Sequence, residues 1–129
     1  MLVHFPVALW PAHWGFHVLA GRLPAGLAGL AGFWLLAAGT LLGWAAAVCG
    51  ALDLLKFSRE ADQMRLNRGL LHGGVNGGVL LGFTVLLGLE GRAYPGIAHG
   101  PGWLAGEAVL LGVLLAGNYL GGTIDWRRP

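Results

Sequence analysis

Long apolar runs separated by short polar links dominate the pattern of the chain. Four runs come close to or exceed the roughly 20 residues that a helix needs to cross the hydrocarbon core of a bilayer. They cover about residues 2–20, 27–57, 69–89 and 102–122. The links between them read GRLPAG, SREADQMRLNR and EGRAYPGIAHGPG. This pattern predicts four membrane-spanning helices.

The links are short enough to make successive helices antiparallel neighbours. The sequence therefore predicts an all-α fold, an integral membrane four-helix bundle that forms one domain over residues 1–129. Composition agrees, because only 11% of the residues are charged, against about 25% in soluble domains. The basic second link also contains Glu60 and Asp62. This mixture indicates contact with lipid headgroups and no binding of nucleic acid.

Basic residues and tryptophans give further expectations about the membrane. Six of the eight basic residues fall on the face that holds both termini and the second link, which predicts that both termini are cytoplasmic. The six tryptophans lie mostly near span ends or kinks, and we expect them to anchor the helices at the membrane interface. The basic residues of the first face are Lys56, Arg59, Arg65, Arg68, Arg127 and Arg128, and those of the opposite face are Arg22 and Arg92.

A layer of polar side chains lies inside the predicted spans. His4 is about three residues into the first span, and His72 is about three residues into the third, which runs in the same direction. Asp53 reaches the same depth from the second span, and Asn118 and Tyr119 reach it from the fourth. Polar groups at membrane depth usually face the bundle interior and mark functional sites. The layer is therefore the first candidate site.

Two imidazoles on facing helices can supply both axial ligands of a b-type haem. Asp53 or Asn76 would orient these histidines by a hydrogen bond to the ring N–H that faces away from the iron. Arg65 and Arg68, at the mouth of the layer, would pair with the propionates. The same groups would also serve a metal or quinone site.

Two rows of glycines on the third span distinguish these cofactor hypotheses from a structural one. A haem site would turn the rows inward, to make room for a flat macrocycle beside His72. A cofactor-free accessory subunit of a larger membrane complex would turn them outward, toward partner helices. The rows are Gly69, Gly73 and Gly77, and Gly74, Gly78 and Gly82.

A second group of polar residues forms a reserve site toward the opposite face. His13 and His17 are four residues apart and share a helix face, which is a spacing compatible with metal ligands. His99 and Glu107 fall at a similar level at the entry to the fourth span. Hydrogen-bonded interfacial histidines are the simpler interpretation of this group.

Four segments resemble a known family. The stretches LVHFPVAL, GALDLL, RGLLHGGVN and YLGG are similar to those of the bacterial four-helix membrane proteins named for domain of unknown function 2231, over nearly the whole chain. Members are often joined to, or encoded beside, iron–sulfur or c-type cytochrome modules, which implies a redox setting. This chain lacks the histidine–proline pair that usually precedes the first motif, and it reads GGTIDWRRP where members tend to end in tyrosine and histidine. The family's marked positions correspond to His4, Phe5, Pro6, Asp53, His72, Asn76, Gly121 and Gly122.

Together these patterns favour a b-type haem protein of the bacterial inner membrane. His4 and His72 would hold the haem between the first and third helices. The protein would pass electrons between a membrane donor such as quinol and a c-type cytochrome or iron–sulfur subunit. No nucleophile motif, phosphate-binding loop or pair of catalytic carboxylates is recognisable. An electron-transfer subunit is therefore favoured over a stand-alone enzyme.

Overall fold

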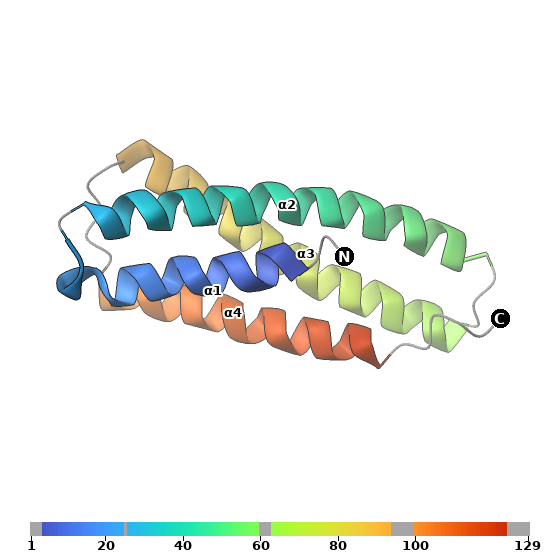
Figure 1. Cartoon of the computed structure of the whole chain (residues 1–129). Helices are drawn as coiled ribbons and strands as arrows, with labels where there is room; N and C mark the ends of the chain where they lie inside the picture. Colours follow the sequence, from blue (N-terminus) through green and yellow to red (C-terminus); the bar gives the residue numbers. More distant parts are fainter. Residues whose placement is uncertain (1–3, 25, 60–62, 94–99, 124–129) are drawn as a thin grey trace.

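The computed structural model describes all residues except 1–3, 25, 60–62, 94–99 and 124–129. Its described part is helical and contains no strand. Figure 1 shows the helices lying side by side along one long axis. They are α1 (His4–Val18), α2 (Leu27–Phe57), α3 (Gln63–Ala93) and α4 (Pro101–Gly122), and a 3₁₀ turn, η1 (Ala20–Arg22), follows α1.

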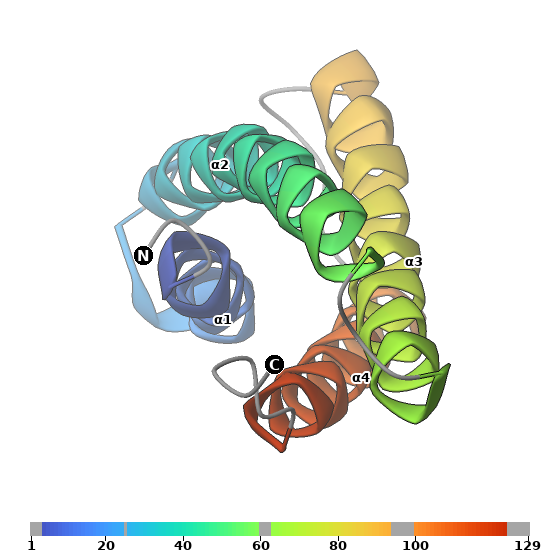
Figure 2. The same cartoon turned by 90° about the vertical axis from the view of Figure 1, so that its right-hand side faces the viewer.

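The helices form a bundle in which successive helices are antiparallel neighbours (Figures 1 and 2). α1 packs against α2 and α4, and α3 packs against the same two helices. α1 and α3 lie on the diagonal of the bundle and have no close backbone contact in the described part of the chain. The predicted fold class, a membrane helical bundle with antiparallel neighbours, is confirmed.

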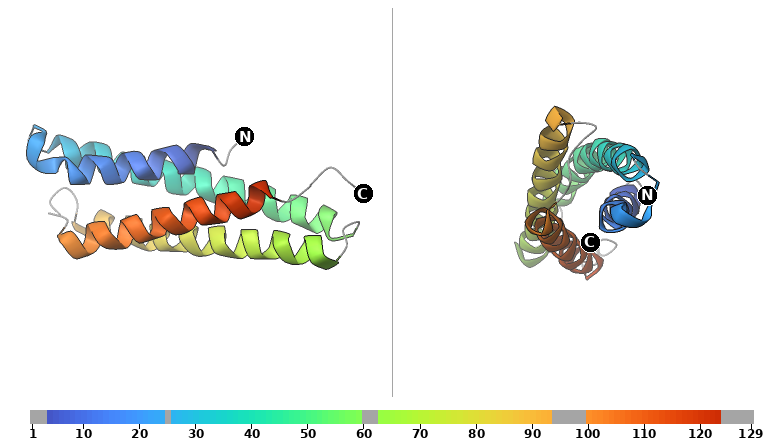
Figure 3. Two further views of the ribbon diagram at one scale, coloured as in Figure 1. Left: turned by 90° about the horizontal axis from the view of Figure 1, so that it is seen from below. Right: turned by 90° about the vertical axis from the view of Figure 1, so that its left-hand side faces the viewer.

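The lengths of the helices refine the predicted spans. Among the described residues, three helices are long and apolar enough to cross a membrane: Leu27–Lys56, Gln63–Arg92 and Pro101–Gly122. α3 begins six residues before the predicted span, because its polar first turns continue the helix beyond the apolar run. The 15 residues of α1 extend for only about 22 Å. Its first described turn stops well short of the far ends of α2 and α3 (Figures 1 and 3).

The inward face of each helix repeats at spacings of three, four or seven residues. This heptad-like stripe is the pattern of helices that pack at shallow angles in bundles. It brings one row of side chains from every helix to the bundle axis. The stripes are Pro6, Trp10, His13 and His17 on α1; Gly32, Leu36, Gly39 and Gly43 on α2; His72, Asn76, Val79, Phe83 and Glu90 on α3; and Glu107, Leu114, Gly117 and Gly121 on α4.

An apolar core fills the middle of the bundle. Trp10 of α1 stacks on Phe83 of α3, with ring centroids 4.2 Å apart, and Leu36 and Val79 are buried beside them. The interfacial role predicted for the tryptophans is therefore wrong for Trp10, because the α1 stripe turns its indole to the bundle axis. Many large apolar side chains, for example that of Leu41, are exposed on the outside. A surface that faces lipid has this character.

Gly39 sets the distance between α1 and α2. A Cβ atom at this position would lie 2.8 Å from Cδ1 of Trp10 and 3.2 Å from Cβ of Leu9. We expect Gly39→Leu to destabilise the bundle by about 1–3 kcal/mol, because the added side chain forces α1 away from α2. Gly50→Leu is the matched control on the same helix, since nothing lies within 4 Å of its Cβ position. Equal unfolding curves for the two variants in mixed micelles would contradict the close packing.

Candidate functional sites

A pocket of about 370 Å³ joins the two histidines of the predicted polar layer. It lies where α1 begins and α4 ends, and we call it the His4–His72 pocket. His4 is exposed at the first described turn of α1, whereas His72 is half-buried on α3. The two histidines come from the diagonal helices α1 and α3. The residues that line the pocket are His4, Val7, His72, Asn118, Gly121 and Gly122.

The imidazole of His72 is held by the backbone of α4. Its Nδ1 lies 2.7 Å from the carbonyl oxygen of Gly117. A carbonyl oxygen can only accept, so Nδ1 carries a proton and donates it, and Nε2 of the neutral ring keeps its lone pair. The amide nitrogen of Asn76 lies 3.1 Å from the same Nδ1. The ring fits only because position 121 is glycine, since a Cβ atom there would overlap it.

Of the other residues predicted for this site, Asn118 lines the pocket, and most of the rest do not. Asp53 is exposed on α2, Arg68 is exposed on α3 and Arg65 is half-buried on the same helix. Tyr119 is exposed next to Asn118, which does line the pocket. The structure therefore brings His4 and His72 to one cavity, places Asn76 against His72, and leaves the predicted carboxylate and guanidinium groups outside the lining.

The glycine rows of α3 do not border the pocket. Cβ atoms at Gly73, Gly74, Gly77 or Gly78 would meet nothing within 4 Å, and one at Gly82 would meet Leu110 of α4. The expectation that the rows make room beside His72 is wrong. Gly73, Gly74, Gly77 and Gly78 are one or two positions along the chain from residues of the inward stripe, so they lie on a different face of α3. The small residues that border the pocket come from α4 instead.

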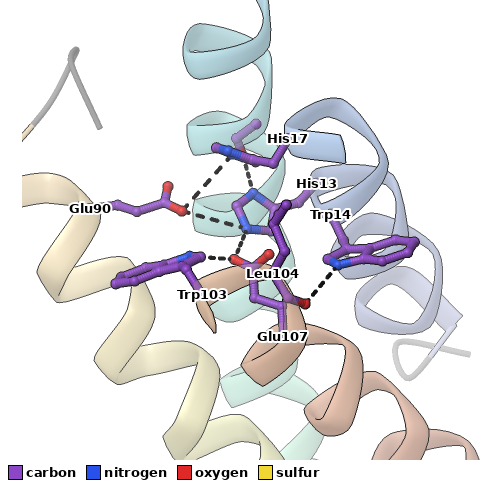
Figure 4. A network of polar contacts seen from close by, with 8 residues as sticks. His13, Trp14, His17, Glu90, Trp103, Leu104 and Glu107 are labelled. Carbon is purple, nitrogen blue, oxygen red and sulfur yellow. Dashed lines mark hydrogen bonds and ion pairs between the residues drawn. The ribbon is translucent and has the colours of Figure 1, made fainter. Parts of the chain in front are cut away.

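A second site lies in the interior, toward the end of the bundle where α1 and α3 end and α2 and α4 begin. Figure 4 shows ionisable side chains of α1, α3 and α4 turned toward one another. We call this group the His–Glu cluster, and it consists of His13 and His17 of α1, Glu90 of α3 and Glu107 of α4. His13 and Glu107 are fully buried, and His17 and Glu90 are less than a tenth exposed.

His13 occupies the centre of the His–Glu cluster. Its Nδ1 donates to the carbonyl oxygen of Gly32 on α2 over 2.9 Å. Its Nε2 lies 2.9 Å from Oε1 of Glu107 and 3.6 Å from Oε1 of Glu90. That same oxygen of Glu90 is 4.0 Å from Nε2 of His17. Four helices thus meet around one imidazole.

Two tryptophans donate hydrogen bonds at the edge of the cluster. Nε1 of Trp103 donates to Oε1 of Glu107 over 2.8 Å. Nε1 of Trp14 donates to the carbonyl oxygen of Leu104 over 3.0 Å and ties α1 to α4 (Figure 4). Both tryptophans were predicted as interfacial anchors. Trp14 also makes a hydrogen bond between α1 and α4, and Trp103 makes one within α4. Oε2 of Glu107 is buried and has no hydrogen-bond partner among the described residues.

Close packing of α1 on α2 is a condition for the cluster. A Cβ atom at Gly32 would overlap the imidazole of His17. Glycine at this position therefore admits the ring of His17 and also supplies the carbonyl oxygen that holds His13.

The reserve site of the sequence analysis gives most of this cluster. The structure brings His13, His17 and Glu107 together, while His99 lies outside the described residues. Sequence reasoning missed Glu90, which directly follows the predicted third span. The signal that identifies Glu90 is the stripe of α3, since positions 72, 76, 79, 83 and 90 share one helix face.

Comparison with known proteins gives the family of the chain. Residues 1–128 match the family described as a predicted membrane protein, DUF2231, and the chain belongs to this family. None of the curated proteins and none of the solved structures compared with the chain matches it. The family description agrees with the three long apolar helices in identifying a membrane protein.

Proposed function

We propose that this member of the DUF2231 family binds one b-type haem in the His4–His72 pocket and serves in electron transfer. The observation that supports this most directly is one cavity lined by two histidines from diagonal helices of a membrane bundle. Two imidazoles are the axial ligands of many b-type haems, and such sites lie in bundle cores between facing helices. A bound haem would supply one-electron redox chemistry.

The residues around the pocket fit this ligand set. Histidines that bind a metal usually donate their second ring N–H to a backbone carbonyl or carboxylate, which fixes the tautomer. His72 does this through Gly117, so its Nε2 is the atom that would coordinate iron. Asn76 lies against the ring of His72 on the same helix. Arg65 and Arg68, also on α3, would pair with the propionates.

The proposed setting is the bacterial inner membrane, with both termini cytoplasmic. The basic second link between α2 and α3 supports this orientation. Electrons would pass between quinol in the bilayer and a c-type cytochrome or iron–sulfur subunit. The pocket, which opens beside the short α1, would lie near the membrane surface on the cytoplasmic side.

A cofactor-free accessory subunit is the second candidate function. Gly73, Gly77, Gly74 and Gly78 of α3 face open space on the outside of the bundle. Rows of small residues four apart allow membrane helices to approach closely. A partner helix would pack on this face, and the outward placement of these four glycines is the observation that favours the accessory role.

Histidine variants test the haem ligands. We expect His4→Ala and His72→Ala each to abolish the low-spin haem absorbance, since each removes one axial ligand, while the protein still inserts into the membrane. His99→Ala is the matched control, and it should keep the full spectrum. The measurement is the visible spectrum of each variant purified in detergent, normalised to protein. If both ligand variants keep the spectrum of the unchanged protein, the ligand assignment is wrong.

A further inference from the structure

The geometry of the His–Glu cluster points to a second site, and we infer that it binds one divalent transition-metal ion of the zinc class through His13, His17, Glu90 and Glu107. This site lies apart from the His4–His72 pocket. His13 comes nine residues after His4 on α1, which is about 13 Å along a helix. The inference therefore does not depend on haem binding.

The donor atoms converge on one point. Side-chain donors of His13, His17 and Glu90 all lie within 4.8 Å of one another. Oε1 of Glu90 is 3.6 Å from Nε2 of His13 and 4.0 Å from Nε2 of His17, which is too long for hydrogen bonds. Two donors at about 2.0–2.1 Å from a tetrahedral zinc ion are about 3.3–3.4 Å apart. A small contraction around an ion would bring these atoms to ligand positions.

The surroundings of the donors resemble those of protein metal sites. His13 donates its Nδ1–H to the carbonyl of Gly32, so Nε2 points into the cluster with a fixed tautomer. Glu107 is held by the indole N–H of Trp103, and ligand carboxylates are typically held in this way. Oε2 of Glu107 is buried without a hydrogen-bond partner among the described residues, and it is available to an ion. Imidazole and carboxylate donors together suit zinc, iron and manganese.

Charge balance also favours an ion. Two buried carboxylates and two neutral imidazoles carry a net charge of −2, which is costly away from water. One divalent cation makes the cluster neutral, and so do two bound protons. Metal binding at this site should therefore release about two protons, because the ion replaces them on the ligands.

A cluster that holds only protons is the rival interpretation. It explains the 2.9 Å contact between His13 and Glu107, where one proton must lie between the two atoms. In this interpretation Glu90 makes ion pairs only, since its Oε1 lies 3.6 Å from Nε2 of His13 and 4.0 Å from Nε2 of His17, too far to share a proton with either ring. The convergence of three donors on one point favours the metal.

The experiment uses the full chain with His4→Ala and His72→Ala, purified without a histidine tag, so that the first pocket offers no imidazole. Zn²⁺ is titrated calorimetrically in two buffers of different ionisation enthalpy, which counts the released protons. Co²⁺ is added separately, because its visible d–d bands report a site with nitrogen and oxygen ligands. We expect one ion per chain, release of about two protons, and a higher unfolding temperature with Zn²⁺.

Ligand variants in the same background give the decisive comparison. Glu90→Gln and His17→Gln should each weaken Zn²⁺ binding at least about 100-fold, beyond the 10- to 100-fold typical of losing an outer hydrogen-bond partner. Asp53→Asn is the matched control, because it removes an exposed carboxylate and should leave binding unchanged. Absence of one-to-one binding in the parent chain would overturn the inference in favour of a proton-holding cluster. Binding that survives both ligand variants would overturn it equally. The Co²⁺ bands of this double-alanine parent provide a readout that does not depend on the folding of the two ligand variants.

Discussion

Glu107→Ala should destabilise the metal-free protein by about 3–5 kcal/mol, because removing one partner of a buried ion pair leaves the other uncompensated. Glu107 is fully buried, and its Oε1 accepts from Trp103 at 2.8 Å and faces His13 at 2.9 Å. Its loss leaves the Nε2 of a fully buried imidazole and an indole N–H without their acceptor. The measurement is equilibrium unfolding in mixed micelles containing EDTA.

Two further variants separate the causes of this loss. Glu107→Gln keeps the shape of the side chain and one acceptor oxygen, so we expect it to lose less than half as much stability as the alanine variant. Asp53→Ala removes an exposed carboxylate on α2 and should change stability by no more than about 0.5 kcal/mol. If the Glu107→Ala and Asp53→Ala variants unfold alike, the cluster does not stabilise the bundle.

Trp10→Ala is the second large effect, with an expected loss of about 3–5 kcal/mol, the range for truncating a buried aromatic side chain. The indole is 2% exposed and stacks on Phe83 with an interplanar angle of 12°. It also fills the space above Gly39 and Gly43 of α2. The cavity left by alanine would remove contacts of α1 with both α2 and α3.

Trp34→Ala gives a matched control for the same chemical change. Trp34 lies on α2 and is 62% exposed on the outside of the bundle. In a bilayer its indole contacts lipid, so truncation leaves no internal cavity, and stability should fall by less than about 1 kcal/mol. Similar losses in the two variants would contradict the placement of Trp10 in the core.

The helices could be predicted from sequence because the membrane imposes their length and polarity. The predicted spans 27–57 and 102–122 agree closely with Leu27–Phe57 and Pro101–Gly122. The start of α3 could not be predicted in this way, since Gln63 and the following polar turns carry no hydropathy signal. Their helix is supported by local contacts, such as that from Nε2 of Gln63 to Oδ1 of Asn67.

The sites were harder to predict because side-chain direction depends on the partner helix. His4 and His72 were expected at one depth, and the structure lines one pocket with both. The glycine rows beside His72 were expected to face inward, but the heptad-like stripe places His72 and Asn76 inward and turns Gly73, Gly74, Gly77 and Gly78 outward. Composition alone does not show which of two adjacent faces is buried.

Glu90 is a residue whose burial could not be predicted from its position in the sequence. As the residue just beyond a predicted span, it is at a position where an exposed interfacial acid is ordinary. Its burial follows from its place on the α3 stripe, where it meets His13 and His17 of the diagonal helix. The stripe continues past the end of the predicted span, and on that basis Glu90 belongs to the reserve site.

The two sites divide the bundle along its axis. The His4–His72 pocket opens beside the start of α1, and the His–Glu cluster is enclosed near the end of the same helix. The stacked pair of Trp10 and Phe83 lies between them. Loss of haem from the first site should therefore leave Zn²⁺ binding at the second unchanged.

The measurement that tests the central claim most directly is a reduced-minus-oxidised visible spectrum of the unchanged protein. It is made on protein purified in detergent from haem-sufficient cells, with a pyridine haemochrome assay for stoichiometry. Binding through His4 and His72 predicts a sharp low-spin b-type spectrum with about one haem per chain. A flat difference spectrum, with no haem in the assay, would contradict the haem proposal and favour the accessory-subunit role.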